Sequence, residues 1–115
     1  MTPEQFVRVL RQVIGDRVAG DELKTLALPP GRAPQAALLE LSAWYLQLAE
    51  SDRAMLRRVL QRTVDSTMFG VLCVLDGVSV IEDPPGRGEL VLEHIGPRGR
   101  TRLNDPATTS LHDLW

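Results

Sequence analysis

Residues 51–77 read SDRAMLRRVLQRTVDSTMFGVLCVLDG, and apolar side chains recur in this segment at steps of three and four residues. This period predicts one long central helix, with an apolar stripe formed by Leu56, Leu60, Val64, Met68, Leu72 and Leu75. No charged side chain occurs between Met68 and Leu75. A helix that is apolar all round has to be covered on every side. We therefore expect the other elements to pack around residues 68–75.

A β-hairpin is the alternative interpretation at the end of this segment. Asp76 and Gly77 lie between the β-prone runs VLCVL and VSVIE, and an Asp-Gly link between such runs is a strong hairpin signal. The helical period is uninterrupted, however, and Gly77 suits the residue that ends a helix. We favour a helix end followed by a strand in residues 71–82, with the hairpin as the alternative.

Two further helices are predicted before this segment. Thr2 and Gln5 match a capping box, and the apolar spacing after them predicts a helix over residues 2–14. Apolar and aromatic side chains recur in the same way over residues 34–49, which predicts a second helix. Residues 16–28 have a weaker helical pattern, and the proline-rich segment after them is a loop.

The pattern changes to strands and turns after residue 77. Three strands are expected, over residues 78–82, 89–95 and 100–103, with Gly and Pro turns between them. The last residues, 109–115, form a short helical turn. The chain thus predicts a single α+β domain over residues 1–115, with three main N-terminal helices, a small antiparallel β-meander and a short C-terminal turn.

Composition limits the classes of function. Hydrophobic residues make up 43% of the chain, charged residues 24%, and the net charge is -2, so neither disorder nor general attraction to nucleic acid is expected. The single cysteine, Cys73, excludes an intramolecular disulfide and a four-cysteine zinc site, and it suits a cytoplasmic protein. The amino terminus does not match a signal peptide, and no apolar run reaches the length of a membrane span.

The second half of the chain resembles a group of small bacterial proteins of uncharacterised activity. In these proteins an FG-x-L-x-x-LDG segment precedes a short sheet and an L-H-D-L-aromatic terminus. The matching residues here are Phe69, Gly70, Leu72, Leu75, Asp76 and Gly77, then Leu111, His112, Asp113, Leu114 and Trp115. The resemblance covers about half of the chain and implies no particular activity.

Five polar residues are the candidate binding residues: Asp65, Asp76, His94, His112 and Asp113. The first two lie in or beside the apolar half of the central helix, where an unpaired carboxylate would be costly. The two histidines are not spaced as known metal ligands are, so we expect neither a metal nor another cofactor. Cys73 and His94 could be a nucleophile and its base, but a thiol in an apolar run is typically structural.

Seven arginines form two groups in the sequence: Arg53, Arg57, Arg58 and Arg62 on one side of the central helix, and Arg98, Arg100 and Arg102 in the predicted sheet. Together they could contact phosphate groups. Acidic residues lie among them, however, and the net charge is negative. A solvated helix face is therefore the better interpretation, and an RNA-binding module ranks third among the hypotheses.

Gly70 lies inside the predicted helix, where glycine is less favourable than alanine by about 1 kcal/mol. We expect another segment to approach the helix closely there, so that Gly70→Val would destabilise the fold.

The leading hypothesis is a protein-binding domain, and immunity and antitoxin proteins are a familiar class of small bacterial partner proteins. The alternative is an enzyme or enzyme subunit that uses Asp65, Asp76 or His94. We expect another protein as the partner, without a membrane or nucleic acid, and a homo-oligomer stays open.

Overall fold

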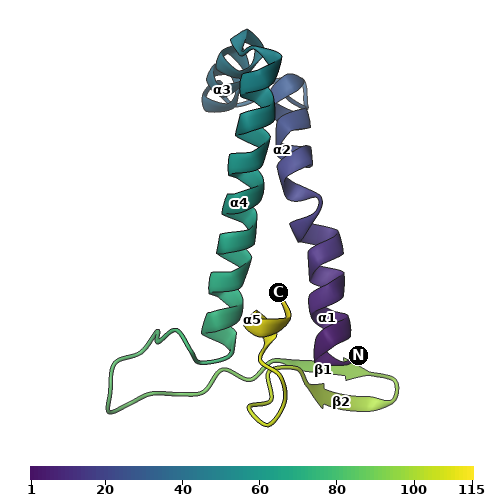
Figure 1. The fold of residues 1–115 in the computed structure, drawn as a ribbon, viewed down its shortest axis with the longest axis vertical. Helices are drawn as coiled ribbons and strands as arrows, with labels where there is room; N and C mark the ends of the chain where they lie inside the picture. Colours follow the sequence, from purple (N-terminus) through teal and green to yellow (C-terminus); the bar gives the residue numbers. More distant parts are fainter.

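Two helical arms diverge from one end of the molecule, and the C-terminus lies between their far ends (Figure 1). The computed structural model describes residues 1–115. Helices precede strands, so the fold is α+β as predicted. The elements in chain order are α1 (Pro3–Leu10), the π-helical turn η1 (Arg11–Gly15), α2 (Val18–Ala27), α3 (Ala36–Gln47), α4 (Glu50–Leu75), β1 (Glu93–Gly96), β2 (Gly99–Arg102) and α5 (Leu111–Leu114).

The predicted central helix is confirmed as α4, which forms one arm by itself. Residues 71–75 are helical, so the hairpin alternative is wrong. Gly77 follows the helix with a φ of +73°, a conformation that glycine adopts without the steric cost that a Cβ would add. The helical period of the apolar residues therefore identified the structure of this segment correctly.

The other arm consists of α1, η1 and α2. Thr2 and Gln5 form the predicted capping box, since each side chain bonds to the backbone N–H of the other residue. The helix predicted over residues 2–14 changes to a π-helical turn at Arg11. At the end of that turn, Gly15 is buried against Trp115, and a Cβ at this position would lie 3.0 Å from the indole ring.

Two small apolar clusters hold the arms together, one at each end of α4. Val7, Leu72 and Leu111 join α1, α4 and α5. Leu23, Leu26 and Tyr45 join α2 to α3, and Leu56 and Leu60 of α4 pack against them. Only 12 of the 115 residues are buried, so neither cluster is a large core.

The expectation that the second half of α4 is covered on every side is wrong. Phe69, Gly70 and Val71 are exposed, and Leu72 and Cys73 are the buried residues of the helix. The reason is that α1 and α5 pack on one side of this half, and nothing approaches Gly70 within 4 Å of where a Cβ would be. The close approach predicted from Gly70 is therefore also wrong within the single chain.

The predicted three-stranded meander is a two-stranded hairpin. β1 pairs with β2 in antiparallel register, with Glu93 opposite Arg102 and Gly96 opposite Gly99. Residues 78–82 are not a strand, because no other segment pairs with them. The backbone N–H groups of Val78 and Ser79 instead donate to the carbonyl of Cys73. A strand needs a neighbour for its backbone groups, and this segment has none in the single chain.

The chain leaves an unusually large surface exposed for its size. Its accessible surface is 8357 Å², whereas a compact monomer of this mass exposes about 6,200 Å². Its radius of gyration is 18.6 Å, against about 13 Å for a compact domain of this length. The single chain thus buries much less of its own surface than a chain of this length normally does.

Candidate functional site

The structure brings three of the five candidate binding residues together and leaves two apart. Asp76 follows α4, and its carboxylate meets His112 of α5, which also lies beside Asp113. Asp65 lies eleven residues before Asp76 on the same helix, about 16 Å along its axis. His94 is on β1, where its ring lies against the backbone of Gly96. The five residues therefore do not form one site.

The Asp76–His112 pair holds the C-terminal segment against the end of α4. Asp76 Oδ2 lies 2.7 Å from His112 Nδ1 and accepts a second hydrogen bond from the His112 backbone N–H at 2.9 Å. Because an ionised carboxylate can only accept, Nδ1 carries the proton in this contact. The side chains of Asp76 and His112 are only 5% and 14% exposed. Phe69 covers the imidazole edge to face, at 5.7 Å between ring centroids.

Asn104 is the hydrogen-bonding centre of the same end of the molecule, although it is not among the five candidate binding residues. Its side-chain amide donates to the carbonyls of Leu75 and Leu90, and its Oδ1 accepts from the N–H of Leu92 at 2.9 Å. The residue is 6% exposed. It thus satisfies backbone groups that no strand partner satisfies, which ties the long loop before β1 to the end of α4.

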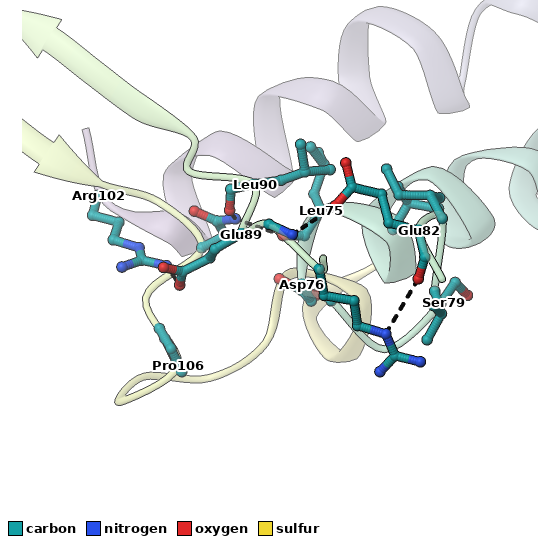
Figure 2. Close-up of a pocket in the computed structure, with 15 residues that line it drawn as sticks. Leu75, Asp76, Ser79, Glu82, Glu89, Leu90, Arg102 and Pro106 are labelled. Atoms are coloured by element: carbon teal, nitrogen blue, oxygen red, sulfur yellow. Dashed lines mark hydrogen bonds and ion pairs between the residues drawn. The ribbon is translucent and has the colours of Figure 1, made fainter. Parts of the chain in front are cut away.

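A cavity of about 210 Å³ opens between this loop and the end of α4. Figure 2 shows Arg102 and Glu89 at one end of the cavity, Ser79 and Glu82 at the other, and Asp76 between them. Each charged group of the lining has a hydrogen-bond partner within the chain. Arg102 bonds to the Glu89 carboxylate, and the Glu82 carboxylate accepts from a loop N–H.

This geometry indicates a structural role for the Asp76–His112 pair. Asp76 lines the cavity, but His112 does not, and the second imidazole nitrogen lies 3.5 Å from Asp113. General acid–base catalysis needs a titratable group within reach of the substrate, and the imidazole does not point into this cavity. No three His, Cys, Asp or Glu side chains converge in the structure to hold a metal ion.

Asp65 supports a hydrogen bond that Gln61 makes between the two arms. Its carboxylate accepts from Gln61 Nε2 at 3.2 Å, and the same nitrogen donates to the Gly15 carbonyl at 2.9 Å. This bond links α4 to η1 between the two apolar clusters. Asp65 is therefore paired, as the cost of an unpaired carboxylate on that face requires.

The four arginines of α4 do not form one solvated face. Arg53 donates to the carbonyls of Leu46 and Leu48, and its guanidinium lies 4.8 Å from the centre of the Tyr45 ring. Arg57 lies against Gly20 of α2. Arg57, Arg58 and Arg62 are all exposed. Three of the four therefore lie on an exposed face, as a solvated face requires, and Arg53 is the exception because it is bound to the end of α3.

The most unusual surface of the molecule is α3, which sequence analysis did not select as a site. Glu40 is its only charged residue, and Ser42 and Tyr45 are the only two of its twelve residues that are buried. Four large apolar side chains of the helix are about half exposed: Leu39, Leu41, Trp44 and Leu46. The composition of residues 36–47 could have identified this surface from the sequence, since a helix that is apolar all round is normally covered.

No helix of the structure is both long enough and apolar enough to span a lipid bilayer. No protein family, curated protein or solved structure matches the chain.

Proposed function

We propose that this chain is a protein-binding domain whose contact surface is α3. The observation that carries the proposal is a helix with one charged residue and two buried residues out of twelve. Leaving such a helix in water is unfavourable, because each exposed Leu or Trp forfeits the free energy of burial. Large contiguous apolar surfaces on soluble chains mark interaction sites, so a second protein surface that covers α3 would recover this free energy.

The composition of the surface also supports a protein partner. Trp44 is 50% exposed, and the helical period places it on the same side of α3 as the exposed Leu41. Tryptophan is enriched among residues that dominate protein–protein binding, where it fills a pocket on the partner. The α3 helix is fixed in place by Tyr45 and by the Arg53 bonds to its last carbonyls, so little ordering of this surface is needed on binding.

Within this class, we propose an immunity or antitoxin type of partner protein as the first to test. The support is the small size of the chain and its resemblance to small bacterial proteins, together with a surface suited to contact and not to chemistry. The free, buried thiol of Cys73 supports a reducing, cytoplasmic setting.

The test compares capture of partners by the wild-type chain with capture by Leu41→Glu/Trp44→Glu. Both side chains are half exposed, so the variant should keep its helical circular dichroism. A matched control, Gln12→Glu/Thr108→Glu, adds the same charge at exposed polar positions. We expect the wild type and the control to retain a common partner that the α3 variant binds at least tenfold more weakly. Equal capture by all three chains would contradict the proposal.

A further inference from the structure

A stripe of four exposed residues lies on a different side of α4 from the residues that pack on α2 and α3. It consists of Asp52, Met55, Val59 and Arg62, and we call it the α4 stripe. These residues follow one another at steps of three, four and three, the spacing of the contact positions of a coiled coil. Met55 and Val59 are 54% and 55% exposed. The face of α4 that packs on α2 and α3 uses other residues, Leu56 and Leu60.

The charges at the two ends of the stripe have no partners in the chain. Asp52 and Arg62 are exposed, and the ion pairs of the structure involve neither of them. They lie ten residues apart, about 15 Å along the helix axis, too far to pair with each other. The stripe thus has an acidic end, an apolar middle and a basic end.

We infer that the α4 stripe binds the same stripe of a second copy of this chain, with the two helices antiparallel. The four positions are symmetric about residue 57, so an antiparallel pair places Asp52 opposite the Arg62 position of the other copy and Met55 opposite its Val59 position. A two-fold axis repeats both contacts, as a closed dimer requires. A parallel pair would instead bring equal charges together at both ends, and such contacts are unfavourable.

The exposed surface is large enough for this dimer and for the contact on α3. A standard interface takes about 800 Å² from each partner, and the chain exposes about 2,000 Å² more than a compact monomer of its mass. Pairing through α4 would therefore use less than half of this excess. The dimer rests on the proposed function in one respect, because both treat exposed apolar surface as contact surface. It concerns a different face of the molecule and a different partner.

The test uses two charge reversals, Asp52→Arg and Arg62→Asp, with molar mass measured by light scattering after gel filtration. At roughly 100 µM, above the micromolar Kd of the weaker interfaces of standard size, the wild type should have twice its chain mass of 12.7 kDa. Each reversal alone places equal charges opposite each other and should weaken the dimer at least tenfold. Both side chains are exposed, so the variants should fold.

An equimolar mixture of the two variants makes the test specific. In the antiparallel pair, each basic position of the Asp52→Arg chain meets an acidic position of the Arg62→Asp chain, so the mixture should form a heterodimer. The double variant Asp52→Arg/Arg62→Asp should also recover the dimer. Association through α3 would not depend on the signs of the charges at positions 52 and 62. A monomeric wild type, or a mixture that stays monomeric, would overturn the inference. Neither result would change the capture of a partner through α3, which is tested separately.

Discussion

One carboxylate oxygen of Asp76 accepts hydrogen bonds from both the backbone N–H and the ring Nδ1 of His112, thirty-six residues further along the chain. This contact fastens α5 to the end of α4 by two hydrogen bonds. Leu111, the residue before His112, is fully buried in the apolar cluster with Val7 and Leu72. The polar and apolar contacts therefore position the same short helix.

Removing either partner of this contact should destabilise the fold. Leaving one partner of a buried hydrogen bond unsatisfied costs about 1–3 kcal/mol, so we expect Asp76→Ala and His112→Ala each to lower the free energy of unfolding by about 2 kcal/mol. The double variant should lose less than the sum of the two single variants, because both single variants remove the contact between the Asp76 carboxylate and the His112 ring. Urea unfolding measures all three. Asp113→Asn is the control, because that side chain is 65% exposed. Effects of the two single variants that simply add would disprove the coupling.

Asn104→Ala should be among the most destabilising single substitutions in the chain. It removes three hydrogen bonds and leaves the partner groups of Leu75, Leu90 and Leu92 without replacements in a part-buried region. Unsatisfied buried groups cost about 1–3 kcal/mol each. Asn104→Asp is the informative comparison, since it keeps the acceptor for Leu92 and loses both donors. If thermal unfolding shows both variants to be as stable as the wild type, the assigned role of Asn104 is wrong.

Gly70→Ala should stabilise the folded chain. The position is helical, its φ is not positive, and a Cβ there would meet nothing within 4 Å. Replacing glycine by alanine in an exposed helix interior gains up to about 1 kcal/mol. Gly77→Ala is the contrasting variant, because its φ of +73° disfavours any Cβ. A loss of stability in Gly70→Ala, measured by denaturant unfolding, would show that another segment does approach this turn.

The difference between these two glycines shows what the sequence could predict. Gly77 has a local role at a helix end, and local rules identified it. The reason for a glycine at position 70 depends on what lies beside the helix, which apolar spacing does not describe. The same limit explains the missing strand at residues 78–82. Their side chains favour a strand, but no segment of the chain pairs with them, and local sequence does not show this.

The residues of the candidate site could also be predicted from the sequence only in part. Asp76 was selected because a carboxylate beside an apolar helix end needs partners, and the structure provides two from His112. Asn104 was missed because its three bonds are to backbone groups far from it in sequence, which no motif marks. The exposure of α3 was missed because apolar spacing predicts that a face is covered without saying by which chain.

Cys73 should react slowly with a small alkylating reagent in the folded chain. The residue is 7% exposed, so its sulfur is hard to reach, and reaction requires local opening of the structure. The rate at pH 7 should rise on addition of denaturant. A Cys73→Ala variant, which removes the sulfur, controls for modification elsewhere. A folded rate equal to the denatured rate would mean an accessible thiol, which would favour the enzyme alternative.

The most direct test of a protein-binding role for α3 is hydroxyl-radical footprinting of this helix, in native host cells and in the purified chain. Trp44 is 50% exposed in the single chain and should be oxidised readily in the purified protein at low concentration. We expect oxidation of the peptide containing Trp44, Leu41 and Leu46 to be reduced severalfold in cells, while oxidation of the exposed Ile81 is similar in both. Equal oxidation of the Trp44 peptide in cells and in the purified chain would contradict it.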